Sequence, residues 1–385
     1  MAGTEAIDLA AAEAVSRADE HPFVARVRAY ADDALRPTGL RTDRESVTRE
    51  RVSELARLGL LNHLAPAELG GAGLDRAADR RLHELVAGGC FNTWLVWAQH
   101  APLVGRLASA VAEGGPVSAL ARQVLRGEVL VGAAISDIRR FPRGHLSAGR
   151  TARGWVLDGV ASWVSGWGLH AALAVAAVDE STRTVVTALV PVQPAMRASP
   201  LDLAAVRGSR TSRVQLHDLV VDEEQVIGTE ALDDWRHKDL GVASDARPHH
   251  FGLAGTVLDE LEHADSPQAR EVARRWRPRV AAIRASAYHL ADAAAEHGGE
   301  HRLAERLAVK VASGEALAAL TRALVVARAG RGLSTDDTAQ LHASSALFVL
   351  VQGQNADVRR AQLGHLAGEG DRPAASRPPD QRHVP

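Results

Sequence analysis

The spacing of apolar residues changes twice along the chain. Up to about residue 125 they recur at helical intervals, as between Val47 and Leu58, which is the period of an amphipathic helix. Thr42 and Glu45 precede this run at the spacing of a capping box, and Gly59 follows it as an expected C-terminal stop. The first third of the chain is therefore predicted to be helical.

From Gly127 to Gly228 the apolar runs become short, partly alternating and rich in β-branched residues, separated by turn residues. The expected strands cover residues 129–134, 155–157, 171–178, 184–192 and 213–221. Helical spacing then returns to about residue 366, with Pro278 expected to kink or split a helix over 269–297. This order predicts an α+β fold: a helical domain (1–125), a β domain (126–230), a C-terminal helical bundle (231–366) and a disordered tail (367–385), whose Pro- and charge-rich composition disfavours packing.

The stretch GWVLDGVASWVSGWG, residues 154–168, carries two indoles, Trp163 and Trp167, next to Ser165. Asp158-Gly159 is a tight-turn signal between two strand-like runs. We therefore predict a β-hairpin here. An aromatic ring beside a hydroxyl suits a planar heteroaromatic ligand, although both indoles could instead fill a core.

Composition limits the classes of function. The formal net charge is −2, which gives no electrostatic reason to expect nucleic acid or an anionic membrane surface as partner. Cys90 is the single cysteine, so a disulfide framework is excluded, and no residues stand at the spacing of a metal site. No signal peptide or membrane-length apolar run is recognisable. We expect a cytoplasmic protein without a bound metal.

Common catalytic motifs are missing: there is no P-loop, no HExxH and no GxSxG, and Gly70-Gly71 lacks the preceding strand that a dinucleotide fingerprint requires. Cys90, Trp94 and Trp97 fall on one helical face, which indicates a wall of a core or pocket. Arg139, Arg140 and Arg143 cluster around Pro142; they are either a solvated loop or a contact for a ligand phosphate or carboxylate.

Three stretches in this order resemble the acyl-CoA dehydrogenase superfamily: LARLGLLNHLAPAELGGAGLD near residue 60, the indole-bearing segment at 154–168, and AAVRGSRTSRVQLHDLVVDEEQVIG ending at Gly228. The resemblance spans roughly residues 45–365. It implies FAD, held between the β domain and the C-terminal helices.

The resemblance also implies which residues contact the flavin. The family's Trp-hydrophobic-hydroxyl triplet corresponds here to Trp163, Val164 and Ser165, and its earlier strand end corresponds to Ala134, Ile135 and Ser136. Hydroxyls and amides next to the ring stabilise its reduced form. The glycine-rich turn that approaches a neighbouring subunit's cofactor corresponds to Gly330, Arg331 and Gly332, where Arg331 could reach a phosphate.

The general base departs from the family pattern. Where ordinary members carry a Glu before Gly-Thr, this chain has Gln352, a neutral amide that cannot accept the α-proton. Some relatives place the acid on an earlier helix, and Asp245 lies at about that position, which makes it the candidate catalytic residue.

Three functions remain open. The first is an FAD-dependent oxidoreductase acting on a CH–CH bond of an acyl thioester, free or carrier-bound, with a possible electron-transfer partner. The second is a flavin-dependent monooxygenase on the same fold, which does not need the catalytic Glu. The third is a non-redox acyl-CoA dehydrogenase-like protein. The Ala- and Leu-rich helices from Arg302 onward predict a homodimer or homotetramer.

Overall fold

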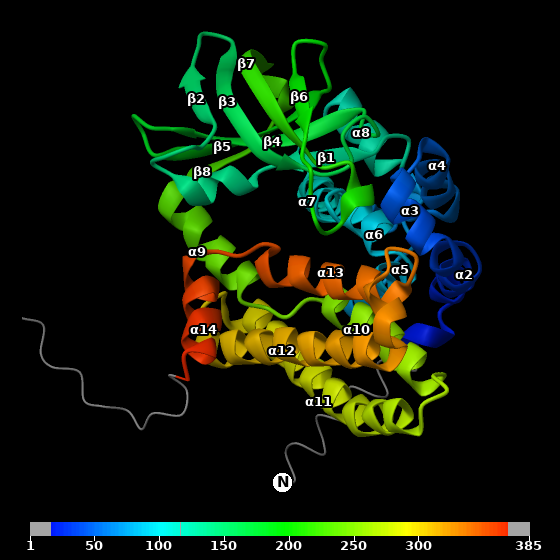
Figure 1. The fold of residues 1–385 in the computed structure, drawn as a ribbon. Helices are drawn as coiled ribbons and strands as arrows, with labels where there is room; N and C mark the ends of the chain where they lie inside the picture. The colour runs from blue at the N-terminus through cyan, green and yellow to red at the C-terminus, as the bar shows by residue number, and fades with distance from the viewer. Residues whose placement is uncertain (1–16, 116, 369–385) are drawn as a thin grey trace, which may run out of the picture.

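The computed structural model describes residues 17–115 and 117–368. Figure 1 shows the predicted order: helices, a β domain, and a bundle of helices at the C-terminus. The α+β fold class is confirmed. The predicted tail lies outside the described residues from residue 369 on. Within the described residues, no helix is both long and apolar enough to cross a bilayer.

The N-terminal region consists of short helices packed around a common core. They are α2 (Pro22–Tyr30), α3 (Gly39–Glu45), α4 (Arg49–Leu58), α5 (Arg76–Gly89), α6 (Phe91–Ala98), α7 (Ala101–Ala112) and α8 (Ala119–Leu125). The predicted capping box at Thr42 is wrong, because Thr42 lies inside α3. Thr48 caps α4 instead, its hydroxyl accepting from the Arg51 N–H. Gly59 ends α4 in the left-handed conformation, as predicted.

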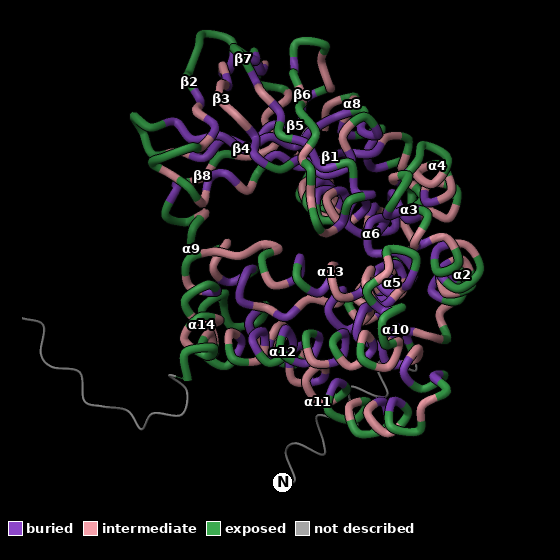
Figure 2. Tube along the Cα trace, viewed as in Figure 1, coloured by how far each residue is buried: buried purple, intermediate pink, exposed green. Residues whose placement is uncertain are grey.

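The β domain is one eight-stranded sheet. Its strands are β1 (Val131–Ala134), β2 (Ser147–Arg150), β3 (Gly154–Val164), β4 (Ala172–Asp179), β5 (Thr184–Pro191), β6 (Arg197–Pro200), β7 (Ser212–Asp222) and β8 (Val226–Ala231). The order is β6-β7-β3-β2-β4-β5-β8, and β1 pairs with β4 in parallel. Every residue of β4 is buried, as Figure 2 shows by colour, because its two sides contribute to different hydrophobic clusters.

The predicted hairpin over residues 154–168 is wrong. Residues Gly154–Val164 form one continuous strand, β3, which pairs with β2 on one side and β7 on the other. Asp158 and Gly159 lie at a register shift against β7, where Gly159 has φ of +126°. A glycine with positive φ serves a bulge as well as a turn. The residues were identified correctly as special, but they bend a strand instead of reversing it.

The C-terminal bundle contains α9 (Leu232–Ala243), α10 (Pro248–Glu262), α11 (Pro267–His297), α12 (Leu303–Arg328), α13 (Thr338–Val351) and α14 (Ala356–Leu366). The 3₁₀ turn η7 (Ala329–Leu333) joins α12 to α13. Helix α11 runs through Pro278 without interruption, so it is not split there. In Figure 1, α13 is the element of the bundle that faces the β domain, and α9 connects the two at one side.

Two glycines set the distance between α5 and α10. A Cβ added to Gly252 would lie 2.2 Å from the Glu84 carbonyl oxygen, and one added to Gly88 would lie 2.8 Å from the Gly252 carbonyl oxygen. The Thr256 hydroxyl donates across the same contact to the Gly88 carbonyl at 2.9 Å. The two backbones therefore touch, which fixes the first turn of α10 against the N-terminal helices.

Candidate functional site

The structure brings together two of the segments that the resemblance assigned to the flavin. The 3₁₀ turn η4 (Ser136–Arg140) follows β1 directly. The buried Asp137 carboxylate accepts the Ser162 backbone N–H of β3 at 2.7 Å, and the Arg140 guanidinium donates to the Ser162 hydroxyl at 2.8 Å. Ser136 and Trp163, far apart in sequence, are thereby held next to one another by a charge-assisted hydrogen bond.

Two large apolar side chains at these strand ends stay exposed: Ile135 at 42% and Trp163 at 39%. Their neighbours Ala134 and Val164 are buried, as the alternation of a strand requires. The Trp163 ring lies 6.3 Å from that of Phe348 on α13, so it is at the junction between the β domain and the bundle. An exposed indole beside an exposed isoleucine fits a planar ring that would cover both.

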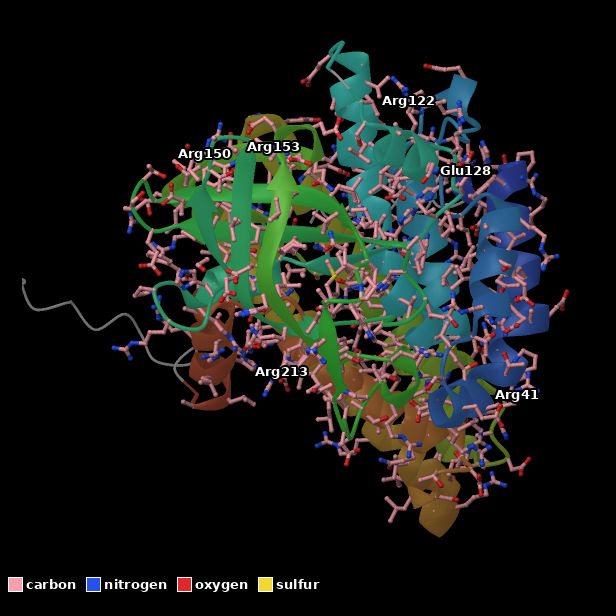
Figure 3. The ribbon with its side chains drawn as sticks, turned by 90° about the horizontal axis from the view of Figure 1, so that it is seen from above. Arg41, Arg122, Glu128, Arg150, Arg153 and Arg213 are labelled. Atoms are coloured by element: carbon pink, nitrogen blue, oxygen red, sulfur yellow. The ribbon has the colours of Figure 1, made fainter. Side chains whose placement is uncertain are left out.

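Trp155, a second indole on β3, differs from Trp163 in its burial. Trp155 is buried, and the Arg150 guanidinium lies over its ring at 4.9 Å. Arg150 and Arg153 pair with the carboxylates that follow β7. Seen from above in Figure 3, these two arginines lie together on the β domain, away from Arg213. Trp155 therefore belongs to the packed, charged end of β3, and Trp163 to its open end.

Ser165 is buried, and its hydroxyl is hydrogen-bonded to that of Thr211 at 2.9 Å, which in turn bonds Ser209 at 2.7 Å. Ser165 is thus part of a chain of three hydroxyls, and its role toward a flavin stays a prediction. The sequence did not single out Thr211 or Ser209 as site residues, although both lie within the segment AAVRGSRTS on which the resemblance rests.

Gly330, Arg331 and Gly332 form η7 at the far end of α12 from Arg306. Arg331 is exposed, and its Nε lies 3.1 Å from the Asp337 carboxylate. Asp337 also caps α13, accepting from the Ala339 N–H at 2.9 Å. An exposed arginine fixed only by a helix cap remains accessible to a phosphate, which is compatible with the predicted contact to a neighbouring subunit's cofactor.

Asp245 lies in the linker between α9 and α10. Its Oδ1 accepts from the Arg306 Nε at 2.7 Å, and its carbonyl oxygen accepts from the Lys310 ammonium at 3.1 Å. The carboxylate therefore holds the linker against α12. Gln352 is the C-cap residue of α13. Its side chain is a neutral amide, so no carboxylate is present at this position.

Imidazoles and aromatic rings fill the interior below this junction. Trp94 of α6 stacks on His249 of α10 with ring centroids 4.1 Å apart, and its indole N–H donates to His83 at 3.1 Å. Burial is the main cause that lowers the pKa of His83 to about 4 and holds the pKa of His249 and His250 well below the ordinary value. The sequence indicated the Trp94 face as a wall, but nothing in it pointed to these histidines as its partners.

A cavity of about 430 Å³ opens elsewhere, between α3, the segment that precedes β7, and α13. The Arg207–Asp43 ion pair, at 2.7 Å, lies in its wall. None of the predicted cofactor residues lines this cavity.

Comparison with known proteins gives consistent results. Residues 17–113 match the family model of the acyl-CoA dehydrogenase N-terminal domain. The mitochondrial short-chain specific acyl-CoA dehydrogenase of Homo sapiens is 24% identical over 374 residues, covering 88% of each chain.

Solved structures show the same fold. Butyryl-CoA dehydrogenase from Megasphaera elsdenii superposes with a TM-score of 0.72 at 16% identity, over 90% of this chain and 97% of that one. Dibenzothiophene monooxygenase from Paenibacillus sp. A11-2 gives 0.72 at 17% identity, over 91% and 98%. The chain therefore has the fold of these acyl-CoA dehydrogenase-like structures, and its residues 17–113 match the N-terminal domain model of the acyl-CoA dehydrogenases.

Proposed function

We propose that this protein is an FAD-dependent oxidoreductase, with the flavin ring at the junction between the β domain and α13. The observation that carries the proposal is the convergence of Ile135, Ser136 and Trp163, with the apolar pair left exposed at one place. When bound, the flavin supplies two-electron redox chemistry. The chain's own contribution is to cover one ring face with the Trp163 indole and to offer the hydroxyls and amides of Ser136 and Ser165.

The substrate proposed first is an acyl thioester, free or attached to a carrier, oxidised at its CH–CH bond. That reaction needs a group that accepts the α-proton. Asp245 is the candidate for this role, although Arg306 already engages one of its oxygens. The electrons would pass to an electron-transfer partner.

Flavin-dependent monooxygenation is the second candidate, and one specific observation favours it. Gln352 carries an amide, and the Asp245 carboxylate is committed to an ion pair with Arg306. Neither of the two expected positions therefore supplies a free carboxylate, and monooxygenation does not depend on one.

Fluorescence titration of FAD into purified apoprotein tests the cofactor assignment. Trp163→Ala removes a ring contact that contributes about 1–3 kcal/mol, so the FAD dissociation constant should rise about tenfold or more. Trp276→Ala is the matched control, because this partly buried indole lies on α11, outside the β domain. Equal FAD affinity in the parent and Trp163→Ala would refute the proposed position of the flavin.

Anaerobic mixing of the FAD-loaded protein with acyl thioesters then separates the two reactions. Bleaching of the visible flavin band indicates dehydrogenation, and Asp245→Asn should abolish it if Asp245 is the base. Absence of bleaching, together with substrate hydroxylation when reduced flavin and O₂ are supplied, indicates monooxygenation. A protein that binds no FAD at all would be the non-redox member of the superfamily.

A further inference from the structure

Lysine is almost absent from this chain. Of its 45 lysine and arginine residues, only Lys238 and Lys310 are lysines. Lys238 is exposed on α9 and pairs with Glu230 at 2.7 Å. Lys310, on α12, is 5% exposed. Because an ammonium group is among the least favourable groups to bury, its position inside the bundle requires a reason.

Among the described residues no carboxylate forms an ion pair with the Lys310 ammonium, although Asp245 acts on it electrostatically. The ammonium's only hydrogen bond among the described residues goes to the Asp245 carbonyl oxygen, at 3.1 Å. Arg306, one turn earlier on the same helix, is fully engaged by comparison: it binds the Asp245 carboxylate and the carbonyl oxygens of Gly299 and Gly241. Arg306 is thus a structural cation, whereas two of the three Lys310 N–H donors have no acceptor.

A second cation lies beside it. Arg247 is the N-cap residue of α10, and its one hydrogen bond from the guanidinium goes to the Val242 carbonyl oxygen at 2.8 Å. The charged and titratable groups that surround Lys310 are Arg247 and Asp245 in the linker, Arg306 on α12, Arg139 on η4 with its partner Asp239 on α9, and His249 and His250 on α10. Asp239 neutralises Arg139, and Asp245 neutralises Arg306, so the charges of Arg247 and Lys310 stay uncompensated.

His249, two residues after Arg247 in the chain, carries an unpaired polar atom. His249 is 2% exposed, and its Nε2 has no hydrogen-bond partner among the described residues. It lies in the first turn of α10, a helix of 15 residues whose dipole favours negative charge at this end. A buried donor or acceptor without a partner is unfavourable unless a ligand supplies one.

We propose that Lys310, Arg247 and His249 bind an oxyanion, the carboxylate or phosphate group of the substrate, at the N-terminus of α10. The inference rests on the proposed function, because it places this group beside the flavin junction: Arg139, which acts electrostatically on Lys310, belongs to the turn that begins at Ser136. A guanidinium fork and an ammonium are the donors that suit such a group. The substrate is therefore an anionic small molecule, or a molecule with one anionic arm.

Anion binding at this site should be coupled to proton uptake by Lys310, and this uptake can be measured. Burial, and next the charge of Arg247, lower the pKa of Lys310 to about 7 in the ligand-free protein. An anion bound next to the amine favours its protonated form and so raises this pKa. Between the two pKa values binding takes up a proton, and this uptake falls toward zero at pH values well below 7, where the amine is already charged.

The presence of only two lysines makes this measurable. Protein labelled with [ε-¹³C]lysine gives two side-chain signals, which Lys310→Met assigns. Titration with pH should show Lys238 ionising in the ordinary lysine range and Lys310 near neutrality. Inorganic phosphate and acetate, added separately at matched ionic strength, are the probes. We expect at least one of them to raise the Lys310 pKa by one unit or more, which corresponds to a tenfold preference for the charged amine.

Variants complete the test. His249→Phe keeps a ring on Trp94 but removes Nε2, and Arg247→Gln removes the second cation; either should weaken the anion response at least tenfold, whereas Lys238→Met should leave it unchanged. A response to phosphate only identifies a phosphate-bearing substrate, and a response to acetate a carboxylate-bearing one. If neither probe moves the Lys310 signal, the inference is wrong. FAD affinity measured on the same samples is independent of this readout, so loss of the anion response with FAD still bound would overturn only the anion site.

Discussion

His170 offers a sharp test of how this fold depends on pH. The residue lies just before β4, is 8% exposed, and neither of its ring nitrogens has a hydrogen-bond partner among the described residues. The imidazole occupies space left by two glycines: a Cβ added to Gly132 or Gly166 would lie 2.4 or 2.6 Å from its ring. Burial is the main cause that lowers the His170 pKa to about 3, and the nearby His100 adds to it.

The direction of the pH dependence follows from which state of the chain, folded or unfolded, binds the proton. An unfolded histidine has a pKa of about 6.5, so below that pH the unfolded chain takes up a proton that folded His170 refuses. His170 therefore imposes no penalty above pH 6.5, and a penalty that grows as the pH falls toward 3. By this linkage it removes about 1.4 kcal/mol from the free energy of unfolding at pH 5.5 and about 2.7 kcal/mol at pH 4.5.

His83 and His100 act in the same direction, in addition to His249 and His250, whose pKa burial holds well below the ordinary value. Burial lowers the pKa of His83 and of His100 to about 4. His100 is held neutral, with Nδ1 accepting from the Val131 N–H and Nε2 bonded to the Leu61 carbonyl oxygen. His83, His100 and His170 together should remove about 4 kcal/mol at pH 5.5, a large part of the stability of an ordinary domain.

Urea unfolding of the apoprotein at pH 8.0, 6.5 and 5.5, at constant ionic strength, measures the effect. His170→Leu fills a similar volume without a titratable group, so the decline in unfolding free energy between pH 8.0 and 5.5 should be smaller by about 1.4 kcal/mol than in the parent. His217→Leu is the control, because this imidazole is exposed. The pH window avoids the buried Glu260, whose pKa is lowered to about 2 and whose contribution is lost only below about pH 4.5. An identical decline in the parent and His170→Leu would refute the reasoning.

Three further predictions concern the site and its supports. Asp137→Ala removes the acceptor that joins η4 to β3 and should weaken FAD binding about tenfold in fluorescence titration; unchanged affinity would show that the two segments are held together by other contacts. Glu84→Gln removes the buried carboxylate that pairs with the half-buried Arg284 and should lower the free energy of unfolding by about 3–5 kcal/mol in urea; a loss below about 1 kcal/mol would contradict this. Gly252→Ala meets the Glu84 carbonyl oxygen and should cost about 1–3 kcal/mol, whereas Gly255→Ala on the same helix has open space and should be neutral or stabilising; equal stabilities would refute the close helix contact.

The sequence by itself determined the order and type of the long elements, because periodicity reports directly which side of an element is buried. It located β4, β5 and β7 and the stop at Gly59. It did not find β2, β6 or β8, which are short and pair at or near the sheet edges or with β3. It also assigned a turn to Asp158-Gly159, since a positive-φ glycine is required by a turn and a bulge alike, and only the neighbouring strands decide between them.

For the candidate site, too, the sequence predicted some features, and only the tertiary structure decided the others. Trp163, Ser165 and Ser136 were singled out from local motifs that resemble those of the acyl-CoA dehydrogenase superfamily, and their contact with a flavin stays a prediction. Tertiary structure alone decided what they contact: Asp137 reaches Ser162, and Trp163 reaches the vicinity of Phe348. Likewise, no pattern around Lys310 indicated that it would be buried beside Arg247 with no carboxylate to share. A sequence fixes which chemical groups a segment carries, but burial and the absence of a counter-ion are properties of the residues that folding brings around it from other elements.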